Sequence, residues 1–184
     1  MLRTSDAILE EHKESQSIFA QMERAHSKYV LLTGSNLGNR EAMLERAKTA
    51  IAEQIGEILE ASSVHESEPW GFESEHQFLN QALLVASEMT PPEVLAAIHT
   101  IEAELGRVRV AEQMVSRTID IDILCSDSEP FSSDNLMIPH ARLSERVFAL
   151  EPLCELIPNW IHPVSGKRYQ ELLHELIIAL PTRI

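Results

Sequence analysis

The sequence has few cysteines, few aromatic residues and no long hydrophobic run. Its two cysteines, Cys125 and Cys154, stand in unrelated contexts without a CxxC motif, which argues against a disulfide framework or a zinc site. No apolar stretch approaches the roughly 20 residues of a membrane span, and residues 1–6 lead into no apolar segment typical of a signal peptide. We therefore expect a reduced, cytoplasmic protein without a membrane anchor.

Positive charge is also scarce. The chain has 15 lysines and arginines against 29 aspartates and glutamates, a formal net charge of −14. This balance argues against bulk binding to nucleic acid or to an anionic membrane, although a local basic cluster can still hold a small polyanion. With 184 residues, 44% hydrophobic and 24% charged, the chain is typical of one globular domain with a sizeable core. The sequence thus predicts one compact domain with small-molecule partners.

The most informative motif lies in residues 117–124, where isoleucines at 119, 121 and 123 alternate with Asp120 and Asp122. This period of two is typical of a half-buried β-strand, and it places both carboxylates on one face. Successive side chains on that face stand roughly 7 Å apart, a spacing that suits carboxylate ligands of hard cations such as magnesium. An ordinary strand whose polar face meets water gives the same pattern.

Arginines flank this strand. Arg107 and Arg109 follow the preceding helix, and Arg117 opens the strand itself. Planar guanidinium groups suit phosphate oxygens, and aspartates suit magnesium, so the combination favours a triphosphate with its metal ions. An isolated Arg-x-Arg pair is usually solvated surface. Here the density of complementary charges indicates a site.

The pattern of apolar and turn residues predicts alternating strands and helices. Residues 58–67 and 78–87 form two strands whose connection is too short for a crossover helix, so we expect them to pair antiparallel. Their connection, residues 68–77, contains proline, glycine and two aromatic residues and suits a binding loop. The fold class is therefore α+β. The other expected elements are a strand at 29–33, a helix capped by Asn39 and ending at Gly56, a helix opened by the capping box Thr90–Glu93 and ending at Gly106, the aspartate strand, a polar loop at 126–135, an apolar run at 136–139, and helices starting near Ser144 and Arg168.

Residues 1–27 read as an N-terminal extension, and residues 28–184 as the domain proper. The extension carries scattered apolar positions amid many charges, a spacing compatible with one weakly amphipathic helix. Three arrangements stay open, in this order of preference: packing against a second copy, packing back on the domain, and fraying. The chain is accordingly expected to be a monomer, or a homodimer formed through this extension.

Several segments within residues 28–175 resemble the 6-hydroxymethyl-7,8-dihydropterin pyrophosphokinase family, in order and with family-like spacing. They are Gly34-Ser35-Asn36-Leu37-Gly38, Phe78-Leu79-Asn80, Gly106-Arg107-Val108-Arg109, Arg117 to Leu124 with the Arg-x-x-Asp-x-Asp signature, and Ile138-Pro139-His140 followed by Arg146 and Phe148. The resemblance implies a folate-pathway enzyme that moves the β,γ-pyrophosphoryl group of ATP onto the pterin hydroxymethyl oxygen and releases AMP. It also implies a three-layered α/β/α sandwich with a ferredoxin-like core and a mainly antiparallel sheet.

The resemblance also assigns site residues. Asp120 and Asp122 would hold two Mg²⁺ ions, and these aspartates with Arg107 and Arg117 would form the catalytic set. The residues implied to contact ATP are His99, Glu102, Arg109, Ile123, His140 and Arg146. Those implied to contact the pterin are Ser67, Glu68, Trp70, Phe78, Asn80 and Phe148, with the pterin stacked between Phe78 and Phe148 and its amide edge bound by Asn80.

The residues alone also permit plainer interpretations. Phe78 and Phe148 are more typical of core positions, and His140 of an ordinary loop histidine. His99 and Glu102 resemble an exposed helical face. These interpretations stay open until the positions of the side chains are known.

Some positions depart from the family pattern. Met114 stands where some members have a tryptophan that closes over both substrates, and Val115-Ser116 replaces a Gly-Pro pair. Asn135 replaces an arginine, while Met137 and Ala141 stand where some members have polar or aromatic nucleotide contacts. We expect an active enzyme with altered nucleotide contacts, and a loop at 110–116 that closes over ATP with Met114 as its cover.

Two other functional classes fit parts of the sequence. One is a non-catalytic ferredoxin-like module that binds a nucleotide or metal, and the other is an interaction subunit that acts through residues 1–27. A module of the first kind needs only one pocket. The acidic pair with its arginines and the separate aromatic pocket with Asn80 therefore favour a two-substrate enzyme.

Overall fold

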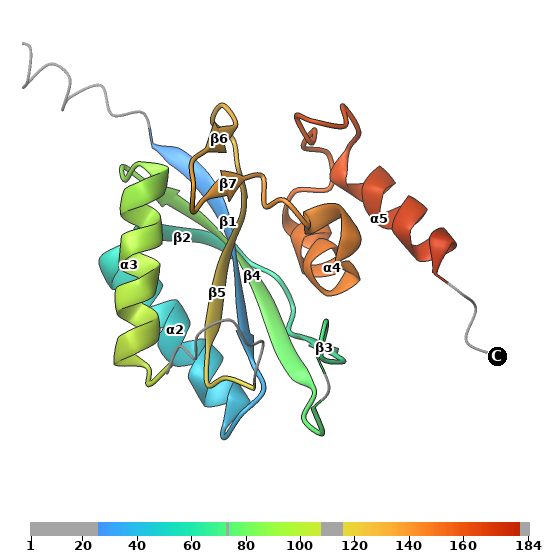
Figure 1. Ribbon diagram of the computed structural model, residues 1–184. Helices are drawn as coiled ribbons and strands as arrows, with labels where there is room; N and C mark the ends of the chain where they lie inside the picture. The colour runs from blue at the N-terminus through green and yellow to red at the C-terminus, as the bar shows by residue number, and fades with distance from the viewer. Residues whose placement is uncertain (1–25, 73, 108–115, 181–184) are drawn as a thin grey trace, which may run out of the picture.

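The computed structural model describes residues 26–72, 74–107 and 116–180. Its elements, shown in Figure 1, are β1 (Ser27–Ser35), α2 (Arg40–Gln54), β2 (Glu57–Ala61), β3 (His65–Ser67), β4 (Phe78–Ser87), α3 (Pro91–Glu104), β5 (Asp120–Ser126), β6 (Phe131–Ser132), β7 (Met137–Ile138), a 3₁₀ turn η1 (Leu143–Glu145), α4 (Val147–Leu156) and α5 (Tyr169–Ala179).

The main sheet has the order β2-β4-β1-β5, and β3 extends it by pairing with β4. All of these pairings are antiparallel. Two β-α-β crossovers, β1-α2-β2 and β4-α3-β5, interleave so that each skips one strand. This is the ferredoxin-like arrangement, so the predicted α+β class and antiparallel pairing are confirmed.

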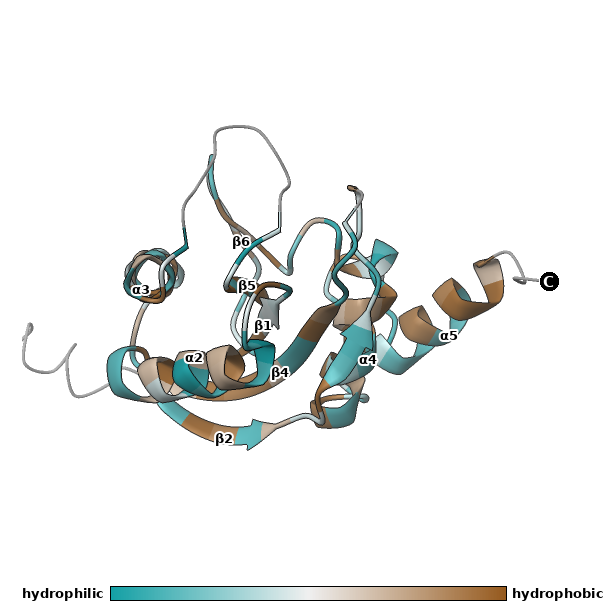
Figure 2. Ribbon diagram, turned by 90° about the horizontal axis from the view of Figure 1, so that it is seen from below, coloured by the Kyte–Doolittle hydropathy of each residue, from teal (hydrophilic) through white to brown (hydrophobic). Residues whose placement is uncertain are grey.

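Helices cover both faces of the sheet. Figures 1 and 2 show α2 and α3 to one side of the strands and α4 and α5 to the other. The side chains of β1 divide accordingly, because Tyr29 and Leu31 pack with α2 and α3, whereas Val30 and Leu32 pack with α4 and α5. Successive side chains of a strand point to opposite faces, so a strand between two helical layers is apolar along its length. The predicted three-layered sandwich is confirmed.

The predicted helix signals are present. The Asn39 side chain caps α2 by accepting a hydrogen bond from the Ala42 N–H at 3.1 Å. At the start of α3, the Thr90 N–H donates to the Glu93 carboxylate at 2.7 Å, half of the predicted capping box. Gly106 ends this helix with a φ of 84°, a backbone conformation that glycine adopts without strain.

The structure corrects the boundaries of three elements. The strand predicted at 58–67 is two strands, β2 and β3, because Ser63 turns its N–H and hydroxyl to Glu155 of α4, both at 2.7 Å. The polar loop at 126–135 contains β6, which forms a small hairpin with β7. The helix predicted to start near Ser144 begins as the 3₁₀ turn η1. Arg146 is extended there, so α4 starts one residue later.

Some predictions fall outside the described residues. These are the helix within the N-terminal extension, the ATP contact of Arg109, and the loop at 110–116 with Met114 as its cover, apart from Ser116. They stay predictions. Among the residues that the structure does describe, no helix combines the length and apolar character needed to cross a membrane.

Gly56, between α2 and β2, gives a test of the packing of the sheet. A Cβ at this position would lie 2.1 Å from the backbone oxygen of Ala86 in β4. We expect Gly56→Ala to lower the free energy of unfolding by about 3 kcal/mol, because β4 must shift to relieve the overlap. Urea denaturation of the purified protein measures this loss.

Gly38→Ala is the matched control. Its Cβ would meet open space, and its φ of 70° limits the cost to the strain of a left-handed residue, about 1–2 kcal/mol. Equal losses for the two variants would contradict the proposed tight contact between Gly56 and β4.

Candidate active site

The site forms where three strands meet. Antiparallel pairing aligns Asp120 of β5 with Gly34 of β1, and Gly34 in turn with Asn80 of β4. Asp122 lies one row further, opposite Leu32. The isoleucines that alternate with the aspartates pack into the core beneath α2 and α3. Both carboxylates therefore point to the other face, as the period of two predicted.

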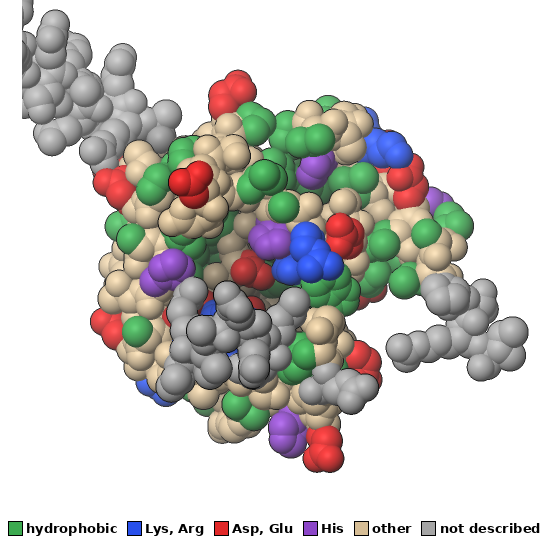
Figure 3. All heavy atoms as spheres, viewed as in Figure 1, with side chains coloured by type: hydrophobic (Ala, Val, Ile, Leu, Met, Phe, Trp, Pro, Cys, Tyr) green, Lys and Arg blue, Asp and Glu red, His purple; other side chains and the backbone are tan. Residues whose placement is uncertain are grey.

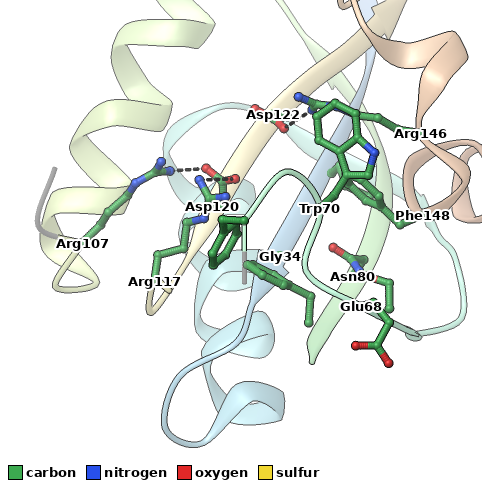
Figure 4. A pocket seen from close by; sticks show the side chains of 14 residues that line it. Gly34, Glu68, Trp70, Asn80, Arg107, Arg117, Asp120, Asp122, Arg146 and Phe148 are labelled. Atoms are coloured by element: carbon green, nitrogen blue, oxygen red, sulfur yellow. Dashed lines mark hydrogen bonds and ion pairs between the residues drawn. The ribbon is translucent and has the colours of Figure 1, made fainter. Parts of the chain in front are cut away.

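A cleft opens on that face beside the start of α4. In Figure 3, acidic, basic and histidine side chains gather near the middle of the visible surface. Figure 4 shows how the labelled side chains converge from different elements. The residues that line the cleft are Leu32, Gly34, Ser67, Glu68, Trp70, Phe72, Phe78, Asn80, Arg107, Arg117, Asp120, Asp122, Arg146 and Phe148.

Arginines neutralise both aspartates. Arg107, just after α3, pairs with Asp120 and also with Glu102. Arg117 lies next to the second carboxylate oxygen of Asp120, with 3.0 Å between Nη1 and Oδ2. Arg146 lies 3.4 Å from Asp122, measured from Nη1 to Oδ2. Figure 4 shows these guanidinium groups directed at the carboxylates from separate elements. The Asp122 carboxylate needs such a partner, because the negative charge of Asp120 disfavours its ionised form.

The pKa values reflect this crowding. Burial, and then the charge of Asp120, raise the pKa of Asp122 to about 7 against the opposing effect of Arg146. Burial alone would lower the pKa of Arg107, but Asp120 and Glu102 outweigh it and raise the pKa. Burial also lowers the pKa of Arg146, although Asp122 opposes this. A further cation near Asp122 would favour its ionised form.

Two guanidinium groups keep hydrogen-bonding capacity. The Nε atoms of Arg117 and Arg146 are buried and have no partner among the described residues. A buried donor without an acceptor is costly, at about 1–3 kcal/mol. An anion bound in the cleft would offer acceptors to these groups, which the surrounding side chains do not supply.

The other half of the cleft is aromatic. Phe78 of β4 and Phe148 of α4 both line it, and Phe72 meets Phe78 edge-on with 6.2 Å between ring centroids. The buried amide of Asn80 lines the same cleft, and its Nδ2 donates to the Ser67 hydroxyl at 2.8 Å. Gly34 leaves room for this amide, because a Cβ there would lie 3.1 Å from Asn80 Oδ1. Aromatic faces with one fixed amide suit a flat, polar-edged heterocycle.

Asn36 joins the two halves of the cleft. Its buried side-chain oxygen accepts the Arg117 N–H at 2.8 Å, and its Nδ2 donates to the Ser116 hydroxyl at 3.0 Å. The Ser116 hydroxyl in turn lies 3.0 Å from that of Ser74, in the loop that leads to Phe78. One asparagine thus fixes the backbone of a cleft arginine and connects it to the aromatic half.

Comparison with known proteins gives a consistent result. Residues 30–158 match the family described as 7,8-dihydro-6-hydroxymethylpterin-pyrophosphokinase. The 2-amino-4-hydroxy-6-hydroxymethyldihydropteridine pyrophosphokinase of Porphyromonas gingivalis is 40% identical over 136 residues, which cover 72% of this chain and 92% of that relative. The relative of the same name from Bacillus subtilis is 38% identical over 129 residues, 70% of this chain and 76% of that one.

This chain belongs to the 7,8-dihydro-6-hydroxymethylpterin-pyrophosphokinase family. It is an ATP-dependent pyrophosphokinase of folate biosynthesis, as the sequence resemblance implied.

Solved structures support the fold. The crystal structure of the Plasmodium falciparum HPPK-DHPS S436F/A437G/A613S triple mutant with SDX-DHP matches with a TM-score of 0.68 at 18% identity. The match covers 85% of this chain and 45% of that one, so this chain spans less than half of that larger protein. At this identity the likeness concerns the fold alone.

Most of the predicted site residues of this pyrophosphokinase meet in the cleft. All six predicted pterin contacts line it, together with the four predicted catalytic residues and Arg146. Their contacts with ligands stay predictions. The sequence analysis missed Leu32, Gly34 and Phe72 in the lining, and the linking role of Asn36. The glycine and asparagine lay in a recognised family segment, but only the strand register reveals what they face.

Four predicted ATP contacts lie outside the lining of the cleft. His99 is exposed on α3, whereas Glu102, which also read as part of an exposed face, is only 1% exposed. The interpretation of Glu102 as an exposed residue is wrong. Its carboxylate binds Arg107 and accepts a hydrogen bond from the Ile121 N–H at 2.9 Å. Ile123 packs in the core on the face opposite the aspartates.

His140, the fourth, is a neutral residue at physiological pH. Burial, followed by the charges of Arg146 and Arg142, lowers its pKa to about 4. Its Nδ1 accepts the Arg142 N–H at 3.1 Å, so the proton of the neutral ring resides on Nε2. The contacts of these four residues with ATP stay predictions.

Asn36 provides a test of how the cleft is positioned. We expect Asn36→Ala to lower kcat at least about tenfold, because the Arg117 N–H loses its acceptor at a cost of about 1–3 kcal/mol and the guanidinium shifts. Steady-state assays of AMP formation measure the effect.

Asn39→Ala is the control for this variant. It lies in the same β1–α2 connection and caps α2 without contacting the cleft, so it should cost about 1 kcal/mol of stability and leave kcat unchanged. Similar losses of activity in both variants would show that the effect of Asn36 is only structural.

Proposed function

We propose that the cleft transfers the β,γ-pyrophosphoryl group of ATP to the hydroxymethyl oxygen of 6-hydroxymethyl-7,8-dihydropterin, with Asp120 and Asp122 as the metal ligands. The observation that carries this assignment is the position of two carboxylates, flanked by arginines, beside a separate aromatic pocket with a fixed amide. The assignment is tested by incubating the protein with ATP, magnesium and 6-hydroxymethyl-7,8-dihydropterin and measuring the AMP that forms.

The residues present fit magnesium. No group of three or more histidine, cysteine, aspartate or glutamate side chains suited to a metal occurs within the described residues. Magnesium does not require one, since it is commonly bound by one or two carboxylates together with substrate phosphates and water. Asp120 and Asp122 would hold two ions, and the chemistry that these would supply is neutralisation of the charge that develops during transfer.

The arginines serve the polyphosphate. In the structure, Arg107, Arg117 and Arg146 pair with the aspartate carboxylates. A magnesium polyphosphate would offer phosphate oxygens to the arginines and a cation to the aspartates. Phosphate oxygens would then take the place of the carboxylates at the guanidinium groups, which would leave Asp120 and Asp122 free to hold the metal. The buried Nε donors of Arg117 and Arg146 gain acceptors in the same step. Phosphoryl transfer needs mainly such positioning and charge neutralisation.

The aromatic half binds the pterin. The ring stacks between Phe78 and Phe148, and the Asn80 amide reads its polar edge. Ser67, Glu68 and Trp70 complete the pocket at the side of the β3–β4 connection. The hydroxymethyl oxygen then faces the aspartate row and forms a bond to the β-phosphorus. The bond between this phosphorus and the oxygen that leaves with AMP breaks, and the hydroxyl proton is released to solvent. A module that only senses a nucleotide has no use for this second pocket, so transfer is favoured over sensing.

The assembly of the enzyme is a separate matter. We propose that residues 1–27 take no part in transfer and that the chain is a cytoplasmic monomer, or a homodimer through this extension. Light scattering of the full chain and of a variant that lacks residues 1–25, which keeps all of β1, distinguishes these states when each is also assayed for AMP formation. Loss of activity on its removal would contradict the proposed separation.

The metal assignment predicts the behaviour of aspartate variants. We expect Asp120→Ala and Asp122→Ala each to reduce kcat at least about a thousandfold, because a lost charged ligand removes several kcal/mol of transition-state stabilisation. Circular dichroism checks that the fold is retained. Asp134→Ala, at an exposed loop carboxylate, is the control and should turn over normally. Near-normal activity in both cleft variants would refute the assignment.

The pterin assignment predicts a ligand-specific loss. We expect Asn80→Ala to weaken pterin binding about tenfold or more and to leave ATP binding nearly unchanged, because the polar edge of the ring stays unpaired at about 1–3 kcal/mol. Calorimetry with each ligand separates the two effects. Gln81→Ala removes a buried amide whose Nε2 donates to the Ser62 backbone oxygen, and this variant controls for general destabilisation. Equal losses of affinity for pterin and ATP would show that Asn80 supports the structure and does not bind the pterin.

A further inference from the structure

Trp70 is held by two arginines. The guanidinium carbon of Arg142 lies 4.1 Å from the centroid of its ring, and that of Arg146 lies 4.7 Å away. The indole also contacts the Phe148 ring, with 6.3 Å between the ring centroids and an angle of 55° between the ring planes. Figure 4 shows Trp70 next to Arg146 and Phe148 at the edge of the cleft. A cation over an aromatic face is attracted by the negative potential of the ring.

Arg142 itself does not line the cleft. Its Nε donates to the Glu145 carboxylate at 3.0 Å, and its side chain is half exposed. The backbone of Arg142 is fixed separately, since its N–H donates to His140 Nδ1 at 3.1 Å. Removal of the side chain therefore leaves this turn in place. Any effect of Arg142 on the reaction must pass through the residue on which it stacks.

The two arginines differ in their contacts with groups other than Trp70. Arg146 is also paired with Asp122 and contacts the Phe148 ring at 5.7 Å, so a bound metal polyphosphate would redirect it. Arg142 has no such second role in the cleft. Among the described residues, its guanidinium contacts the Glu145 carboxylate and the Trp70 indole. It can hold Trp70 whichever partner Arg146 takes.

We infer that Arg142 is a positioning residue for the pterin half of the site, because its guanidinium holds the Trp70 indole against Phe148. The inference rests on the proposed function, in which Trp70 and Phe148 border the pterin. It predicts that loss of the stack lets the indole move and lowers pterin affinity about two- to fivefold, the effect expected of an exposed cation–π contact. ATP affinity and kcat at saturating pterin stay unchanged.

The first experiment examines the stack in the free protein. Trp70 and Trp160 are the two tryptophans of the chain, so a Trp160→Phe background isolates the fluorescence of Trp70. We expect Arg142→Ala to increase quenching of Trp70 by acrylamide. Glu145→Gln removes the ion-pair partner of Arg142 but not the cation, and should leave the quenching unchanged. Equal quenching in the Arg142→Ala variant and the background protein would overturn the inference.

The second experiment is a double-mutant cycle scored by the KM values for pterin and ATP. Arg142→Ala should raise the KM for pterin about two- to fivefold, and Arg142→Lys should raise it less. In a Trp70→Ala background, Arg142→Ala should cause no further rise in the KM for pterin. Additive losses, or a rise in the KM for ATP, would overturn the inference by showing a direct contact of Arg142 with a substrate. Unchanged kinetics despite altered quenching would overturn it too.

The wild-type chain separates this inference from the proposed function. If wild-type protein forms AMP from ATP and the pterin, the proposed function holds and the cycle decides the role of Arg142. If wild-type protein forms none, the proposed function fails and the inference falls with it, whatever the quenching of Trp70.

Discussion

The structure of the site depends on the neutralisation of two carboxylates that share one face of one strand. Asp120 and Asp122 point into one cleft, where burial and the charge of Asp120 raise the pKa of Asp122. Arg107, Arg117 and Arg146 relieve this repulsion from three places in the chain: the end of α3, the approach to β5 and the start of α4. These three segments must therefore all be folded correctly before Asp120 and Asp122 can be stable next to each other.

The same ion pairs tie the layers of the sandwich together. Glu102, inside the α3 layer, binds Arg107 and the backbone of β5, so the helix and the catalytic strand are joined by charge as well as by apolar packing. On the opposite face, Arg146 connects Asp122 to the rings of Trp70 and Phe148. Buried pairs add little net stability but penalise other arrangements, so this network favours one geometry of the cleft.

Much of the fold could be predicted because its signals are local. The caps at Asn39 and Thr90 and the alternation at residues 119–123 depend on neighbours in the chain, and each indicated the correct element. The errors arose where distant groups compete for the backbone. Ser63 bonds to Glu155 of α4, which interrupts a strand that looks continuous in sequence, and β6 exists only because β7 returns beside it. Glu102 was predicted to be exposed because its partners, Arg107 and the Ile121 N–H, both lie beyond the end of α3.

The sequence by itself determined the class of fold, the family and the shared face of the two aspartates, since these follow from periodicity and from motifs that lie within short segments. Tertiary structure alone decided which residues meet. Strand register set Asn80 opposite Gly34 and Gly34 opposite Asp120, and packing of α4 brought Arg142 and Arg146 over Trp70. The physical reason is that contacts between distant segments depend on register and on the packing of whole layers, and neither is encoded in any one segment.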